Sequence, residues 1–246
     1  MATPKKTANS KGGTPPPLGP PAPKWKARRV SLVLAAIVVV AILAAGAFFF
    51  ASKSARTSDP PDVILITIDT LRADALGYSG NNRVKTPFLD GLAARGIVYT
   101  NAHAHNVVTL ASHTNILTGL YPYQHGIRDN AGFVLDPRFP TVGAMLKTAG
   151  YTTAPFVSAF PLDGRFGLNR GFDLYDDRYR EASDPLDFVV QERPAEETLA
   201  SAKRWYDGAP AGKKFIWIHL YDPHAPYDAP SPYREQYKDS PYLGEV

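Results

Sequence analysis

The chain has 246 residues, no cysteine and a formal net charge of +4 at pH 7. Its first 56 residues hold nine Lys and Arg and no Asp or Glu, whereas the rest hold 18 Lys and Arg against 23 Asp and Glu. The basic character therefore belongs to an N-terminal tail and gives no reason to expect a nucleic-acid partner, and the lack of cysteine excludes disulfides and a thiol nucleophile.

Residues 1–29 predict a disordered, basic, Pro-rich cytoplasmic tail. Seven of the first 25 residues are proline, and Gly, Ser, Thr and Lys make up much of the remainder. Such a composition buries too little apolar surface to offset the entropy of an ordered chain.

Residues 30–51, "VSLVLAAIVVVAILAAGAFFFA", predict a single transmembrane helix followed by a linker over residues 52–61. The 22 residues carry no charge, and a helix of this length spans the roughly 30 Å hydrocarbon core of a membrane. Seven Lys and Arg precede the segment but only Lys53 and Arg56 follow it closely, so the N-terminus is expected in the cytoplasm and residues beyond 56 outside it, in the periplasm or the extracellular space. A cleaved signal peptide is the alternative, although its apolar region is normally shorter.

Residues 62–246 predict an α/β domain with a mostly parallel central sheet and helices on both faces. Strands are expected over 62–68, 97–102, 153–158 and 214–221, and helices over 86–95, from Thr109 onward, over 141–150 and over 195–208. Because ligands of such sheets gather beyond the carboxyl ends of the strands, the rule selects Asp69, Thr70 and the segment 219–224. Taken alone, an Asp after a strand is more often a turn or helix cap than a metal ligand.

Four ordered motifs resemble the N-terminal part of a sulfatase-family enzyme within the alkaline phosphatase superfamily. They are "VILITIDTLRAD", "TLASHTNILTGLYP", "GRFGLNRGFD" and "IHLYDPHAPY". The resemblance implies an alkaline phosphatase/sulfatase-like fold. It also implies that 62–246 is only the first part of the catalytic domain, apparently truncated, with an incomplete sheet that exposes an edge.

Thr109 occupies the position of the nucleophile in this resemblance. Family members carry a Cys or Ser there that is oxidised to formylglycine, which threonine cannot form, so no formylglycine is expected. The resemblance implies that Thr109 would instead attack as a metal-bound alkoxide and form a threonyl ester, which favours phosphate esters or diesters over sulfate. The alternative is that Thr109 only caps the helix, a role worth about 1 kcal/mol.

The resemblance also implies roles for other residues. Asp69, Thr70 and Thr109 would hold one divalent metal ion, calcium or zinc. His113 stands where relatives have an arginine beside the nucleophile, and His224 where a histidine contacts the substrate or protonates the leaving group. Arg128 is expected at the cleft edge as a substrate-binding residue. A structural hydrogen bond is the alternative for either histidine, and a helix cap for Arg128.

The sequence thus predicts a membrane-anchored, metal-dependent hydrolase of sulfated or phosphorylated small molecules, glycans or lipids. One alternative is a phosphoethanolamine-type transferase, suggested by the threonine together with the membrane anchor. The other is a non-catalytic family member, because the metal ligands expected late in the family's domains are missing and the 246-residue chain alone is expected to be inactive.

Overall fold

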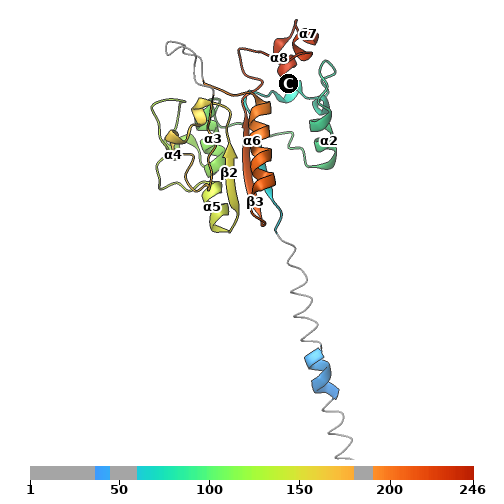
Figure 1. Cartoon of the computed structure of the whole chain (residues 1–246), viewed down its shortest axis with the longest axis vertical. Coiled ribbons are helices and arrows are strands. Elements are labelled where there is room, and N and C mark those ends of the chain that lie inside the picture. The colour runs from blue at the N-terminus through green and yellow to red at the C-terminus, as the bar shows by residue number, and fades with distance from the viewer. Residues whose placement is uncertain (1–36, 45–59, 180–190) are drawn as a thin grey trace, which may run out of the picture. The chain divides into compact units, whose positions relative to one another are not determined.

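The computed structural model describes residues 37–44, 60–179 and 191–246 (Figure 1). Residues 37–44 are helical. Within the three described ranges, no helix is long and apolar enough to cross a membrane. The tail 1–29, both ends of the segment 30–51 and most of the linker 52–61 lie outside the described residues, so the transmembrane helix stays a prediction.

A sheet of three parallel strands lies at the centre of the described part of residues 60–246. The strands are β1 (Val63–Ile68), β2 (Thr152–Phe156) and β3 (Lys214–Leu220), and their order is β1-β3-β2. Their arrows point toward the end of the domain where the helices α7 and α8 lie (Figure 1). The carboxyl ends of all three strands therefore meet at one edge, as the parallel pattern predicts.

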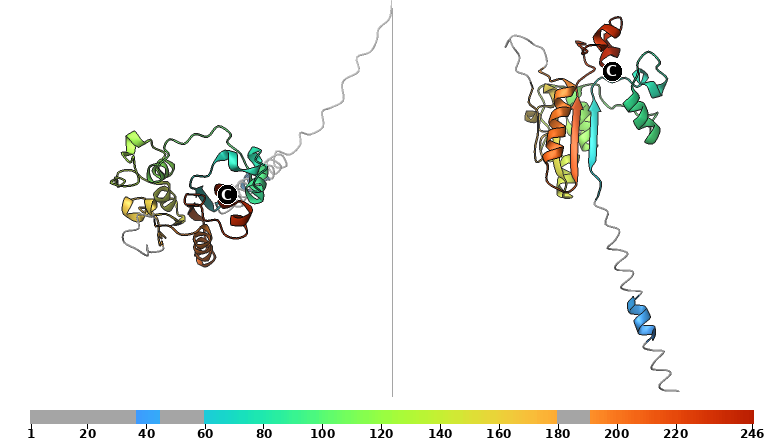
Figure 2. Two further views of the ribbon diagram at one scale, coloured as in Figure 1. Left: turned by 90° about the horizontal axis from the view of Figure 1, so that it is seen from above. Right: turned by 45° about the vertical axis from the view of Figure 1, so that its right-hand side comes forward.

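Alternate side chains of β3 enter two different hydrophobic cores. Phe215 and Trp217 belong to one core with Leu110 of α3 (Thr109–Thr118), on the face where α5 (Val142–Thr148) also packs. Ile216 and Ile218 point to the opposite face, where Ala202 of α6 (Ala195–Gly208) covers them. Helices therefore lie on both faces of the sheet (Figure 2), which confirms the predicted α/β class.

The remaining helices connect these layers. They are α2 (Pro87–Arg95), α4 (Pro122–His125), α7 (Tyr233–Gln236) and α8 (Pro241–Glu245), with short 3-10 helices at Ala73–Ala75, Gly77–Ser79, Phe160–Leu162 and Gly164–Phe166. The predicted helix over 86–95 is present, with Thr86 at its N-cap position and Pro87 as its first residue.

The predicted strand over 97–102 is wrong. This segment has no regular structure, and Ile97 and Tyr99 are 82% and 78% exposed. A β-rich composition forms a strand only where a neighbouring strand can pair with it, and no described strand lies beside this segment.

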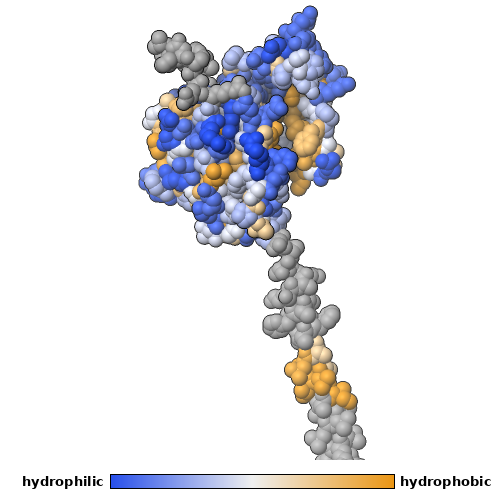
Figure 3. All heavy atoms as spheres, viewed as in Figure 1, coloured by the Kyte–Doolittle hydropathy of each residue, from blue (hydrophilic) through white to orange (hydrophobic). Residues whose placement is uncertain are grey.

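Strand β1 forms one edge of the described sheet. Its side chains Ile64 and Ile66 are 56% and 48% exposed because α6 covers β2 and β3 on that face but leaves β1 open. Hydrophobic side chains are also exposed in the region of α2 (Figure 3). Phe88 and Leu92, both on α2, are among the exposed large hydrophobic residues.

Candidate active site

The hydroxyl of Thr109 points at the carboxylate that follows β1. Thr109 is the first residue of α3, Val108 occupies the N-cap position, and Thr109 Oγ1 donates a hydrogen bond of 3.0 Å to Asp69 Oδ2. A capping hydroxyl would instead accept from a backbone N–H of its own helix. The geometry therefore argues against the simple capping role and places the Thr109 hydroxyl at the positive end of a helix.

Asp69 owes its position to the end of the sheet. Its backbone N–H donates to the carbonyl oxygen of Leu220 at 2.9 Å, which continues the ladder between β1 and β3 by one residue. The carboxylate consequently lies at the carboxyl edge of the sheet, where α3 begins. This is the position that the strand-end rule selects from the sequence.

His113 lies one helical turn after Thr109 and is buried. Its Nδ1–H donates to the carbonyl oxygen of Thr109 at 2.7 Å, and its ring centroid lies 4.7 Å from that of His219 and 5.7 Å from that of Trp217. Trp217 is held in turn by a 3.0 Å hydrogen bond from its indole N–H to Thr67 Oγ1. His113 thus stabilises the first turn of α3 through its hydrogen bond to the Thr109 carbonyl oxygen.

His219 lies in the segment 219–224 that the strand-end rule selects, although the sequence analysis assigned it no role in the site. It is fully buried on β3, and its Nε2 lies 3.5 Å from Asp69 Oδ2. Neither ring nitrogen has a hydrogen-bond partner within the described part of the chain. Its place near the carboxyl end of a predicted strand was the available signal, although the apolar run around it suggested core packing.

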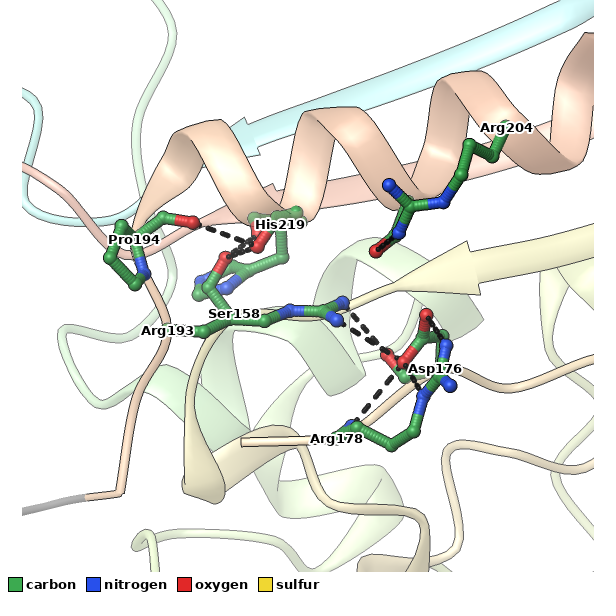
Figure 4. Close-up of polar contacts among 9 residues, drawn as sticks. Ser158, Asp176, Arg178, Arg193, Pro194, Arg204 and His219 are labelled. Carbon is green, nitrogen blue, oxygen red and sulfur yellow. Dashed lines mark hydrogen bonds and ion pairs between the residues drawn. The ribbon is translucent and has the colours of Figure 1, made fainter. Parts of the chain in front are cut away.

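A polar network behind β3 holds the backbone of His219. The Ser158 hydroxyl, just beyond β2, donates to the carbonyl oxygen of His219 and lies 3.1 Å from Thr198 Oγ1 of α6 (Figure 4). The backbone N–H of Arg193 donates to the Ser158 carbonyl oxygen, and the buried guanidinium of Arg193 pairs with Asp176 at 3.2 Å. These contacts tie β2, β3 and α6 together directly beside the site.

At neutral pH the three ionisable groups of the site, Asp69, His113 and His219, carry one negative charge in total, on Asp69. Burial raises the pKa of Asp69, but the electrostatic interaction with the nearby His219 and the hydrogen bond from Thr109 outweigh burial, so its pKa lies below the usual value. Burial, reinforced by repulsion from His219, lowers the pKa of His113 to about 3. Burial also lowers the pKa of His219 against the opposing influence of Asp69. An anionic carboxylate therefore faces two neutral imidazoles.

Thr70 adopts a backbone conformation that is uncommon for a residue with a β-branched side chain. Its φ is 52°, its hydroxyl donates to the carbonyl oxygen of Pro223, and its carbonyl oxygen accepts a 3.0 Å hydrogen bond from the Tyr242 hydroxyl. Strained residues of this kind cluster at functional sites. In this structure Thr70 links the chain after β1 to the loop that carries His224.

His224 and Arg128 do not join the Asp69–Thr109 pair. The His224 ring stacks on Tyr221 at 4.2 Å, its Nδ1–H donates to the Ala225 carbonyl oxygen at 2.7 Å, and its Nε2 lies 3.2 Å from the Tyr221 hydroxyl. Arg128 is exposed on the loop after α4. Their roles in substrate binding stay predictions.

Asn130 contacts the first turn of α3. Its side-chain oxygen accepts a 2.8 Å hydrogen bond from the backbone N–H of Leu110. Replacing Asn130 with alanine is expected to lower the free energy of unfolding by about 1 kcal/mol, because an amide at the helix start loses its partner. Urea denaturation measures this effect. The variant Asn82→Ala is the control, and an equal loss of stability in both variants would contradict the assigned contact.

The residues present supply only part of a metal site. Asp69 Oδ2 and Thr109 Oγ1 are adjacent oxygen donors, and the buried His219 nitrogens lack partners. However, no group of three or more His, Cys, Asp or Glu side chains within the described ranges could hold a metal ion. A divalent cation needs more ligands than these. The predicted site of Asp69, Thr70 and Thr109 is therefore incomplete among the described residues.

A buried histidine next to the site predicts sensitivity of the fold to acid. His125 of α4 is 4% exposed, its Nδ1 accepts from the Ile127 N–H at 3.0 Å, and burial lowers its pKa from 6.5. The unfolded chain therefore binds this proton more readily than the folded chain. The contribution is fully present above about pH 6.5 and is lost as the pH falls toward the folded pKa, by up to about 1.4 kcal/mol per pH unit.

Urea denaturation at several pH values between 7 and 4 checks this expectation. The variant His125→Gln should show a shallower fall of stability with decreasing pH than the unaltered protein, whereas His103→Gln, which alters an exposed histidine, should not. An unchanged pH slope in His125→Gln would contradict the expectation.

Comparison with known proteins agrees with this geometry. The family model described as Sulfatase matches residues 61–245, which is most of the chain. The chain belongs to the sulfatase family. Among curated proteins, this sulfatase-family chain is 36% identical over 104 residues to N-acetylgalactosamine-6-O-sulfatase of Bacteroides thetaiotaomicron, covering 41% of this chain and 20% of that enzyme. It is 27% identical over 215 residues to an uncharacterised sulfatase of Escherichia coli, covering 75% of this chain and 43% of the relative.

Solved structures show the same fold. The phosphonate monoester hydrolase of Agrobacterium radiobacter superposes with a TM-score of 0.59 at 23% identity, over 72% of this chain and 44% of that one. A protein solved in complex with its substrate D-glucosamine-2-N,6-O-disulfate gives a TM-score of 0.61 at 21% identity, over 73% of this chain and 38% of that one. The sulfatase-family chain thus spans less than half the length of these relatives.

Proposed function

We propose that the natively expressed protein is a membrane-anchored hydrolase of sulfate or phosphate esters that acts outside the cytoplasm through a covalent Thr109 intermediate. The single observation that carries this proposal is the hydrogen bond from Thr109 Oγ1 to Asp69 Oδ2, at the start of α3 and at the carboxyl edge of the sheet. The membership of the sulfatase family supports ester hydrolysis as the reaction class.

In the first step, Thr109 Oγ1 attacks the sulfur or phosphorus of the ester. A bond forms to the threonine oxygen, the bond to the alcohol oxygen breaks, and the hydroxyl proton passes to the acceptor Asp69. The departing alkoxide takes a proton from a donor, for which His224 is the sequence-based candidate. In the second step, a water oxygen bonds to sulfur or phosphorus and the bond to Thr109 Oγ1 breaks, which releases sulfate or phosphate. The water proton returns to the donor residue, and Asp69 returns its proton to Thr109 Oγ1, which regenerates the hydroxyl.

The substrate class is proposed from the relatives. Curated relatives include N-acetylgalactosamine-6-O-sulfatase and an ulvan-active sulfatase of Formosa agariphila, both named for sulfated glycans. A threonine nucleophile and the phosphonate monoester hydrolase neighbour favour phosphorus esters. We propose sulfated or phosphorylated glycans, small molecules or membrane lipids as substrates, and calcium or zinc as the metal.

The experiment is an assay of the natively expressed protein against an aryl sulfate, an aryl phosphate monoester and an aryl phosphodiester, each with added calcium or zinc. Release of the phenol from at least one ester supports the proposal. No release from any ester under any metal condition would contradict it.

A second candidate, a non-catalytic family member, is favoured by the incomplete metal site among the described residues. Metal analysis of the purified protein distinguishes the two functions. Stoichiometric, tightly bound metal would argue against the non-catalytic function, whereas its absence together with an absence of hydrolysis would support that function.

A further inference from the structure

A hollow of about 330 Å³ lies between α8 and the chain that follows Asp69. Its lining includes Arg72, Asp74, Asn81, Arg83, Tyr227 and Tyr242. Its floor is the small core in which Ala75 packs with Leu243 of α8. The hollow lies where α8 meets the chain that leads from β1 to α2, at the end of the domain toward which the strands point (Figure 1).

Two residues that line this hollow follow candidate site residues closely in the chain. Arg72 follows Asp69 by three residues, so their Cα atoms lie at most roughly 11 Å apart. Tyr227 follows His224 by three residues. The Tyr242 hydroxyl joins the walls to the site, since it accepts from the Arg72 N–H at 2.8 Å and donates to the Thr70 carbonyl oxygen at 3.0 Å.

The charges of the hollow suit an anion. Arg72 forms a two-bond ion pair with Asp74, at 2.9 and 2.5 Å, which neutralises both. Arg83 donates to Ser240 Oγ at 2.6 Å, and among the described residues no carboxylate is paired with it. Arg83 is therefore the uncompensated cation, and its planar fork matches the oxygens of sulfate or carboxylate.

The aromatic walls suit the body of a sugar. The rings of Tyr227 and Tyr242 meet edge to face at 5.7 Å, and Tyr227 is 44% exposed. Binding sites for small molecules commonly combine such aromatic surfaces with a few polar groups that set orientation.

We infer that this hollow, named here the Arg83 pocket, is a subsite for a second anionic group of the substrate, carried on a saccharide next to the ester that faces Thr109. The subsite rests on the proposed function for its biological role. It selects polyanionic glycans over neutral ones, because Arg83 contributes a charge-assisted hydrogen bond only when a sulfate or carboxylate enters.

Equilibrium titration of the full chain tests this inference, with N,6-O-disulfated glucosamine, N-acetylglucosamine and inorganic sulfate as probes. The disulfated sugar should bind, the neutral sugar should bind much more weakly, and Arg83→Gln should raise the Kd of the disulfated sugar about tenfold. Arg95→Gln, which removes an equal charge from the end of α2, should leave this Kd unchanged. Arg83→Lys should fall between Arg83→Gln and the unaltered chain.

Three results would overturn the subsite: equal effects of Arg83→Gln and Arg95→Gln, equal binding of neutral and disulfated sugars, or no binding of the disulfated sugar. Titration needs no turnover, so the two proposals fail separately. If binding depends on Arg83 but the protein hydrolyses no ester, only the proposed function is contradicted. If the protein hydrolyses an ester but binding does not depend on Arg83, only the subsite is contradicted.

Discussion

Replacing Thr109 with alanine is expected to lower turnover of the natively expressed protein by about three orders of magnitude or more. The reason is that the substitution removes the attacking oxygen, and a missing nucleophile is among the most damaging changes to an enzyme that works through a covalent intermediate. Thr109→Ser keeps the hydroxyl and should retain much of the activity. Initial rates on the best ester of the panel measure the effect.

The matched control for this substitution is Thr118→Ala in the same helix. The Thr118 hydroxyl donates to the carbonyl oxygen of Thr114, one turn earlier, and does not face Asp69. Its loss should leave the rate within a few-fold of the unaltered protein. A Thr109→Ala variant that folds normally and keeps the rate of Thr118→Ala would remove Thr109 from the chemistry.

Replacing Asp69 with asparagine is expected to lower turnover by about 10² to 10⁴-fold. The neutral amide accepts no proton from the Thr109 hydroxyl, and loss of a positioned general base has this size. The Asp69 carboxylate also orients the Thr109 hydroxyl through the 3.0 Å hydrogen bond. In Asp69→Asn, this hydrogen bond is broken when the side-chain NH2 group, rather than the side-chain oxygen, faces the hydroxyl.

Asp136→Asn, on an exposed loop, is the control for the Asp69 substitution. Thermal unfolding of both variants separates a chemical effect from loss of the fold. The assignment predicts that Asp69→Asn melts near the unaltered protein and yet is far less active. Equal activity of the two variants at equal stability would show that Asp69 plays no part in the reaction.

Much of the site follows from local sequence patterns. The apolar run of β1 predicts a buried parallel strand, and the rule that ligands gather at strand ends then selects Asp69. The sequence predicts a helix from Thr109 onward, which puts the hydroxyl at the start of α3, and the structure brings it to Asp69. Each of these inferences depends on a short segment and on one general rule of α/β sheets.

The rest depends on contacts between segments far apart in the chain. The segment 97–102 has the composition of a strand, but nothing among the described residues pairs with it. The strand-end rule includes His219 in the segment 219–224, but only the parallel register of β1 and β3 shows that it lies beside Asp69. Thr70 has a left-handed backbone conformation that composition does not favour, and it adopts this conformation where Pro223 and Tyr242 hold its polar groups.

The most direct measurement is mass spectrometry of the natively expressed protein, quenched in acid during turnover of its best ester and then digested. Our account predicts that the peptide containing Thr109 gains one sulfuryl or phosphoryl group, that fragmentation locates the group on Thr109, and that Asp69→Asn diminishes the signal. An adduct on another residue, or active turnover with Thr109 unmodified under conditions that trap an intermediate, would contradict the account.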